Sequence, residues 1–236
     1  MNWKHAFTSS IGKKLVMGIT GISLIAFLIV HCYANAQIFL PDGYTRYEEI
    51  AHFLGTNPIT RIAEIGLFAG IILHIVQGLM LTAQNRAKRP VSYASYAGSK
   101  NSSWYSRSMG LLGTLILLFL VLHLYHFWAP NRYQQLVTGK EKNLYAEMEA
   151  VFQNGWVVIV YALGCISLAW HLMHGFWSAF QTLGLSTIKY KKVINGVGVG
   201  FSIIVPLIFI AMPVSYYFHW LPSAAECQAA LEAAGH

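Results

Sequence analysis

Five long stretches of this chain contain no aspartate, glutamate, lysine or arginine. A helix needs about 20 apolar residues to cross a hydrocarbon core of about 30 Å, and stretches of this length rarely occur in soluble domains. Extended to their natural ends, the stretches predict spans at about residues 15–40, 59–83, 108–129, 156–183 and 193–220. We therefore expect an all-α membrane protein whose domain covers residues 1–220, followed by a short tail over residues 221–236.

The composition excludes several other classes of protein. Charged residues make up 11% of the 236 residues, against about 25% in a typical soluble domain. This deficit argues against an ordinary soluble enzyme, a disordered tail and a nucleic-acid-binding module. The three cysteines, Cys32, Cys165 and Cys227, form no close pair. A disulfide framework, a zinc knuckle and the attachment motif of a c-type haem are therefore absent from the sequence.

The charges predict how the chain crosses the membrane. Eleven of the 16 lysines and arginines lie before the first span, between the second and third, or between the fourth and fifth, and no acidic residue accompanies them. The positive-inside rule then places the N-terminus in the cytoplasm and the C-terminus outside. The alternative is a cleaved signal peptide ending at Ala34-Asn35-Ala36. The preceding apolar run of about 18 residues is longer than the usual 7–15, which favours a retained span.

Histidines inside the spans are the main candidate functional residues, because ionisable groups in a membrane are costly. His31, His74, His123 and His171 each lie 15 or 16 residues from the point where their own helix enters the membrane, or about 22–24 Å. Since successive helices run in opposite directions, the outer layer holds His31 and His123, and the inner layer holds His74 and His171. The two layers are expected about 15 Å apart.

Two facing imidazoles can supply both axial ligands of a b-type haem, so two layers predict two stacked haems b inside the bundle. Coordination occupies one ring nitrogen, and a carbonyl or hydroxyl can accept from the other. The alternatives are core histidines in a haem-free anchor and a histidine-lined transporter, although a transporter predicts acidic partners within the spans. His126 and His174 lie one turn beyond two of these histidines and are alternative ligands. For His126, a propionate contact, a quinone contact or a simple interfacial position is favoured.

The histidines also belong to short motifs that spread over most of the chain. These are Val30-His31 with Asn35, Ala51-His52-Phe53, Leu73-His74-x-x-Gln77-Gly78, Leu122-His123-x-x-His126 and His171-x-x-His174-Gly175-x-Trp177-Ser178. In these motifs the sequence resembles the dihaem cytochrome b membrane anchor of succinate:quinone oxidoreductases. The type concerned is the single-subunit, five-helix anchor that also occurs in quinol:fumarate reductases. The resemblance extends to about Trp220.

The resemblance implies the same pairing as the depth argument: His74 with His171 at an inner, proximal haem, and His31 with His123 at an outer, distal haem. It also implies a haem pocket that includes Gln77, Gly78, His174, Gly175, Trp177 and Ser178. The implied partners are a flavoprotein with FAD and an iron–sulfur subunit on the cytoplasmic face of the inner membrane. This chain has no FAD or iron–sulfur motif, so succinate chemistry is expected in those partners. The alternative within the same class is the dihaem subunit of another quinone-linked oxidoreductase.

The resemblance places a quinone, with menaquinone favoured, near the outer haem. Glu64 is the one carboxylate at the mouth of the second span, with Arg61 one turn earlier and His52 in the preceding outer segment. A partly buried glutamate beside a quinone can exchange the protons that accompany its redox chemistry. We therefore expect a quinone site formed by Glu64, Arg61, His52 and His126. The alternative is an interfacial ion pair between Glu64 and Arg61.

Overall fold

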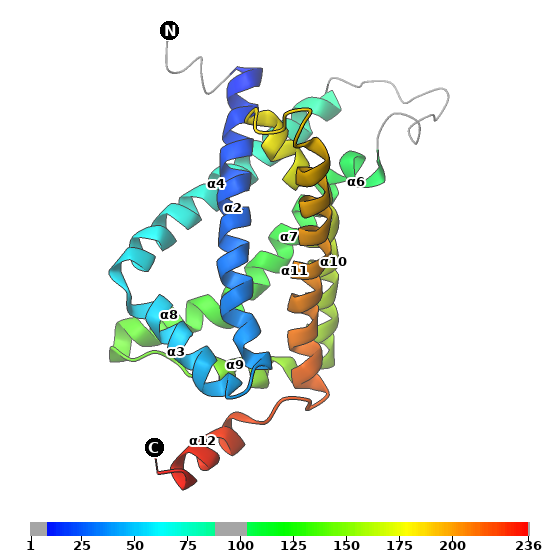
Figure 1. Ribbon diagram of the computed structural model, residues 1–236. Helices are drawn as coiled ribbons and strands as arrows, with labels where there is room; N and C mark the ends of the chain where they lie inside the picture. The colour runs from blue at the N-terminus through cyan, green and yellow to red at the C-terminus, as the bar shows by residue number, and fades with distance from the viewer. Residues whose placement is uncertain (1–8, 88–102, 236) are drawn as a thin grey trace. The chain divides into compact units, whose positions relative to one another are not determined.

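The computed structural model describes residues 9–87 and 103–235, and helices account for most of them (Figure 1). The described part of the chain contains no β-strand. Its elements are α2 (Ser10–Ala36), η1 (Gln37–Phe39), α3 (Gly43–Thr56), α4 (Pro58–Ala87), α6 (Trp104–Arg107), α7 (Met109–His123), η2 (Leu124–Trp128), α8 (Ala129–Thr138), α9 (Leu144–Phe152), α10 (Gly155–Thr182), α11 (Lys191–Tyr217) and α12 (Ala224–Ala233). The predicted all-α class is therefore confirmed.

Five helical stretches are long and apolar enough to cross a membrane. They cover Ile11–Phe39, Pro58–Ala87, Met109–Thr138, Gly155–Thr182 and Lys191–Tyr217. The expected spans agree with these bounds except in the third, which continues about nine residues further through η2 and α8. Polar residues such as Arg132 and Gln135 ended the apolar stretch in the sequence but do not end the helix, because helical hydrogen bonds do not require apolar side chains.

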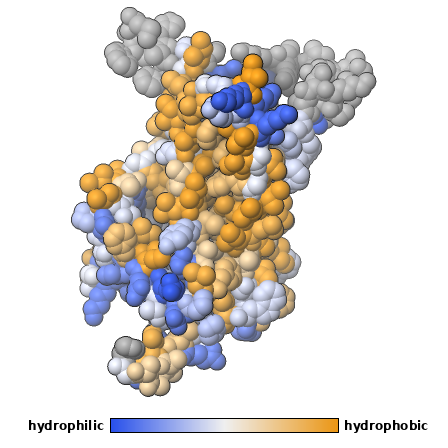
Figure 2. Space-filling view, in the orientation of Figure 1, coloured by the Kyte–Doolittle hydropathy of each residue, from blue (hydrophilic) through white to orange (hydrophobic). Residues whose placement is uncertain are grey.

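The long helices carry apolar side chains on their exposed faces. No residue of α4 is buried, and Ile62, Ile65 and Ile72 along it are each more than half exposed. Figure 2 shows apolar residues over much of the visible surface, with hydrophilic residues gathered near the ends of the long helices. In a soluble protein such a surface would lead to aggregation. Against lipid it is stable, because the backbone polar groups are already paired within the helices.

Backbone contacts divide the chain into two compact units. Unit 1 comprises Met1–Leu28, Ile65–Leu117 and Ser167–Ile204, and unit 2 comprises Ile29–Glu64, Leu118–Ile166 and Val205–His236. All nine acidic residues belong to unit 2, and the eleven basic residues without acidic neighbours belong to unit 1. Four of those eleven, Lys4, Lys88, Arg89 and Lys100, lie outside the described residues.

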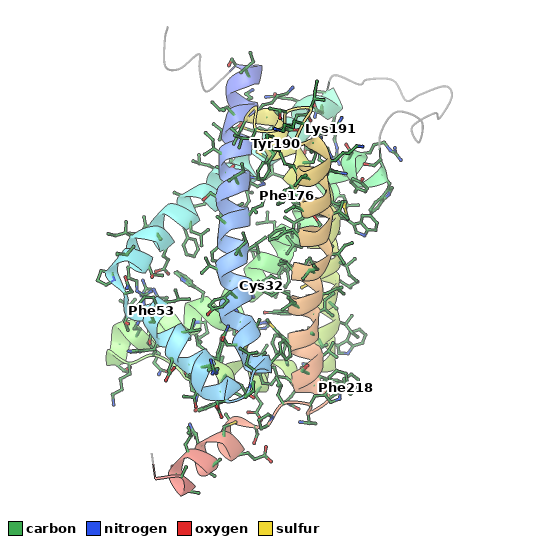
Figure 3. The ribbon with its side chains drawn as sticks, in the orientation of Figure 1. Cys32, Phe53, Phe176, Tyr190, Lys191 and Phe218 are labelled. Atoms are coloured by element: carbon green, nitrogen blue, oxygen red, sulfur yellow. The ribbon has the colours of Figure 1, made fainter. Side chains whose placement is uncertain are left out.

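The core of unit 1 is formed by α10 against α11. Phe176 of α10 is 6% exposed and lies against Phe201, with 5.7 Å between the ring centroids (Figure 3). Gly198 of α11 is buried beneath the same ring, and a Cβ there would lie 2.7 Å from Cδ1 of Phe176. The run Gly196-x-Gly198-x-Gly200 therefore serves close helix packing at Gly198. A Cβ at Gly66 or Gly70 of α4 would meet nothing within 4 Å among the described residues.

Unit 2 has an aromatic core that joins the outer segments to the spans. Tyr145 of α9 is 1% exposed, and its hydroxyl donates to the Pro222 carbonyl at 2.8 Å. Glu48 of α3 accepts the backbone N–H of Tyr145 at 2.8 Å, and burial raises the pKa of Glu48. The C-terminal helix α12 begins at the capping box of Ser223 and Glu226. The tail is therefore a folded part of unit 2.

We predict that Gly198→Ala lowers the thermal stability of the detergent-solubilised protein. The new Cβ overlaps the Phe176 ring, and overpacking of this kind costs about 1–3 kcal/mol. Gly200→Ala is the matched control on the same helix, because a Cβ there meets nothing within 4 Å. It should leave the melting temperature unchanged or raise it, since alanine is the better helix former. Equal melting temperatures for the two variants would contradict the packing described here.

Candidate functional site

Unit 1 brings His74 of α4 together with His171 of α10. Their ring centroids are 6.3 Å apart with an interplanar angle of 66°. Both residues are partly buried, and Nδ1 of His171 is fully buried. Glycines of neighbouring helices lie beside both rings: a Cβ at Gly21 would be in ordinary contact with Cε1 of His74 at 3.9 Å, and a Cβ at Gly113 with Cε1 of His171 at 3.8 Å.

Unit 2 brings His31 of α2 together with His123, the last residue of α7. Their ring centroids are 5.8 Å apart and the rings are almost perpendicular, at 89°. Phe119, Phe127 and Phe209 surround this pair, with ring centroids 5.5–5.7 Å from one imidazole or the other. The surroundings of the pair are therefore apolar and aromatic.

The spacing of both pairs suits a shared metal ion. With metal–nitrogen bonds of about 2 Å on each side, two imidazole centroids lie about 6 Å apart. No group of three or more histidine, cysteine, aspartate or glutamate side chains among the described residues could hold a metal ion. A haem iron takes its other four ligands from the porphyrin, so two histidines are sufficient. The residues present therefore fit two haems b, one for each histidine pair.

The Nδ1 atoms of the four paired histidines have different surroundings. Nδ1 of His74 lies 3.0 Å from the Thr20 hydroxyl, and Nδ1 of His31 lies 3.4 Å from the Asn35 amide nitrogen. Nδ1 of His123 and Nδ1 of His171 are buried and have no hydrogen-bond partner among the described residues. A ligand histidine is normally oriented by a partner of its non-coordinating nitrogen. In this chain the partner with the shortest contact is Thr20.

A π-helix follows His123 directly. The segment η2 covers Leu124–Trp128 and is wider than an α-helix, and such segments occur often at functional sites. Within it, Nδ1 of His126 lies 2.9 Å from the Tyr161 hydroxyl, and the two rings stack with centroids 5.8 Å apart. His126 is therefore turned toward α10, while His123 lies beside His31. Tyr161 was not among the expected site residues, because a tyrosine in an apolar span resembles any other core aromatic.

Three donors converge on the Glu64 carboxylate. Arg61 Nη1 donates at 3.0 Å, Arg132 Nη2 at 3.1 Å and Trp128 Nε1 at 2.6 Å. The expected pair of Glu64 and Arg61 is therefore present, but within a larger cluster. The second guanidinium comes from α8, and the indole N–H comes from η2. Two cations and one N–H donor stabilise the ionised carboxylate.

His52 is connected to this cluster through other side chains. The His52 ring is 72% exposed, and its Nδ1 lies 2.8 Å from the Glu141 carboxylate. Gln135 donates to Glu141 at 3.1 Å and accepts from Arg61 at 2.7 Å. His52, Glu141, Gln135, Arg61 and Glu64 therefore form a continuous set of polar contacts from solvent to the carboxylate. His126 lies outside these contacts and bonds to Tyr161 instead.

The remaining expected haem-pocket residues lie near His171 and His74 along their helices. His174 and Trp177 line a cavity of about 310 Å³ in unit 1, together with Tyr105 and Asn195. Gln77 Oε1 is buried without a hydrogen-bond partner among the described residues. The other three residues, Gly78, Gly175 and Ser178, are partly buried.

Fold and site together define an all-α membrane protein with five spans and two histidine pairs. The chain is similar to the protein named succinate dehydrogenase cytochrome b558 subunit in Bacillus subtilis (strain 168), with 25% identity over 189 residues. The alignment covers 79% of this chain and 83% of that protein. This similarity confirms the resemblance to the cytochrome b membrane-anchor family that the histidine motifs predict. No family model matches the chain, and no solved structure matches it significantly.

Proposed function

We propose that this chain is the cytochrome b membrane anchor of a succinate:quinone oxidoreductase and passes electrons between an iron–sulfur subunit and membrane quinone. The observation that carries the proposal is that four histidines on apolar helices form two pairs. The ring centroids within the pairs are 5.8 Å and 6.3 Å apart. The name of the similar protein and the five apolar helices also support a multi-pass protein of the inner membrane. When bound, haem b supplies reversible one-electron transfer.

Each histidine pair has one task in this proposal. His74 and His171 would hold the inner haem, and His31 and His123 would hold the outer haem. Neutral imidazoles coordinate without placing a net charge of their own in the hydrocarbon region. The aromatic neighbours Phe119, Phe127 and Phe209 would shield a haem held by the outer pair from water.

The partner subunits supply the succinate chemistry. An FAD flavoprotein and an iron–sulfur subunit are proposed on the cytoplasmic face, because this chain carries no motif for either cofactor. Unit 1 offers them a surface with lysines and arginines but no acidic residue. Lys189, Lys191 and Lys192 lie at the start of α11 or just before it, and Lys191 Nζ lies 5.6 Å from the Trp177 ring centroid. Such a surface attracts an acidic docking partner and fits a cytoplasmic orientation.

Quinone is proposed to react at the outer side, beside the Glu64 cluster. A quinone gains two protons when it is reduced, so its site needs a group that can transfer a proton at the ring oxygens. When quinone is reduced, protonated Glu64 would donate a proton to a ring oxygen, and when quinol is oxidised, the Glu64 carboxylate would accept one from a ring hydroxyl. Arg61 and Arg132 hold the carboxylate in position. His52 and Glu141 lie between this carboxylate and solvent, where they exchange protons with the outside. His126, held by Tyr161, is the remaining candidate for contact with the quinone ring.

We predict two haems b for each chain in the purified complex. A reduced-minus-oxidised spectrum should show a haem b α-band, and pyridine haemochrome analysis should give two haems. His74→Ala and His171→Ala should remove the same spectral component, whereas His31→Ala and His123→Ala should remove the other. The absence of a haem band in the wild type would refute the proposed function. Loss of one haem in His174→Ala, with both haems retained in His171→Ala, would move the ligand one turn along α10.

We also predict that Glu64→Gln lowers quinone-linked turnover by about 10²-fold or more, the lower end of the effect of losing a general acid–base group. Glutamine keeps the size and the acceptor oxygen but cannot take up a proton at neutral pH. Both haems and succinate oxidation with a soluble dye acceptor should remain normal. Glu147→Gln is the matched control, because Glu147 is also ion-paired in unit 2, with Lys142 at 2.9 Å. Near-normal quinone turnover in Glu64→Gln would leave Glu64 as a structural ion-pair residue.

A further inference from the structure

Thr20 is a polar residue in the apolar helix α2. Thr20 is only 7% exposed, so its side chain is buried from both lipid and water. The hydroxyl donates to the Val16 carbonyl at 2.8 Å, one turn earlier, and the Met17 carbonyl lies 3.3 Å away. A threonine hydroxyl has one proton and two lone pairs. Its proton is therefore committed to the backbone of α2, and its lone pairs can only accept.

The nearest polar atom outside α2 is Nδ1 of His74, 3.0 Å from the Thr20 hydroxyl oxygen. Because the hydroxyl acts as an acceptor here, Nδ1 must be the nitrogen that carries the imidazole proton. The lone pair of the neutral ring then lies on Nε2. This contact selects one tautomer of His74 and leaves Nε2 as the nitrogen that can bind a metal.

The two histidines of the inner pair differ in this respect. His74 has the Thr20 acceptor, whereas Nδ1 of His171 is buried without a hydrogen-bond partner among the described residues. Gly21, the residue after Thr20, allows the α2 backbone to lie close to the same ring, since its Cβ would come within 3.9 Å of Cε1 of His74. Thr20 therefore supplies the polar contact to the His74 ring, and the α2 backbone at Gly21 lies beside the same ring.

We propose that Thr20 is a positioning residue that orients His74 and increases the basicity of its Nε2 toward the inner haem iron. The inference rests on the proposed function, because it concerns a ligand of that haem. An acceptor at Nδ1–H makes the imidazole a stronger electron donor at its other nitrogen, which stabilises the oxidised metal. Removing the acceptor should raise the midpoint potential of the inner haem and leave the outer haem unchanged.

The test uses the intact complex and three variants. Thr20→Val removes the hydroxyl and keeps the branched shape, and Thr20→Ser keeps the hydroxyl. Thr114→Val is the matched control, because Thr114 makes the same bond to a carbonyl one turn earlier, Gly110, at 2.8 Å. Redox titration of the haem α-bands, together with electron paramagnetic resonance of the low-spin haems, reports on each haem separately. Haem content is measured in parallel.

In Thr20→Val we expect a positive shift in the midpoint potential of one haem and a changed resonance spectrum for that haem alone. The affected component should be the one that His74→Ala removes. Thr20→Ser and Thr114→Val should match the wild type. If Thr20→Val instead loses the inner haem while Thr20→Ser retains it, the hydroxyl is again required.

Three results would overturn the proposal. These are an unchanged inner haem in Thr20→Val, a shift confined to the outer haem, and a Thr20→Ser variant that behaves like Thr20→Val. Each of these results requires that the wild type contain haem. A wild type without haem would refute the proposed function itself, so the two failures are distinguishable.

Discussion

Both ring nitrogens of an imidazole in an apolar helix need a hydrogen-bond partner or a metal ion. Most of the arrangement around the histidines depends on that requirement. A helix buried in hydrocarbon offers few partners, because its own backbone groups are already paired. Each histidine therefore needs a polar partner or a metal ion. Thr20 meets this need for His74, and Tyr161 meets it for His126. Nδ1 of His123 and Nδ1 of His171 have no hydrogen-bond partner among the described residues.

The partly buried Glu64 carboxylate also needs polar partners, and charged side chains supply most of them. A lone carboxylate at the mouth of a span would be costly, and one cation would compensate for it only in part. Glu64 has two guanidinium groups and an indole N–H, supplied by three elements of unit 2. These contacts connect three elements, α4, η2 and α8, whereas a single ion pair would connect only two. It also keeps a charged, proton-accepting group close to the apolar region where quinone dissolves.

Much of the fold was predictable because a helix that crosses a bilayer needs about 20 apolar residues. The absence of charged residues over five stretches located the helices, and counting along them placed four histidines in two layers. The helix of the third span continues about nine residues past the end of the apolar stretch, because the polar residues Arg132 and Gln135 end the hydropathy signal but not the helix. On this continuation Arg132 donates to Glu64, and Gln135 accepts from Arg61. Thr20 was missed although its polarity within an apolar span, at the expected depth of His74, was a usable signal.

The sequence by itself determined the class of protein and the number of long apolar helices, and it predicted the depth of each histidine, because hydropathy and rise per residue are properties of one helix at a time. Only the tertiary structure decided which side chain lies within hydrogen-bond distance of each histidine ring nitrogen. The π-helix after His123 is present in the structure, and no periodicity in the sequence marks it. It turns His126 toward Tyr161 and Trp128 toward Glu64. Contacts of this kind depend on the relative rotation of packed helices, which the side chains of several helices decide together.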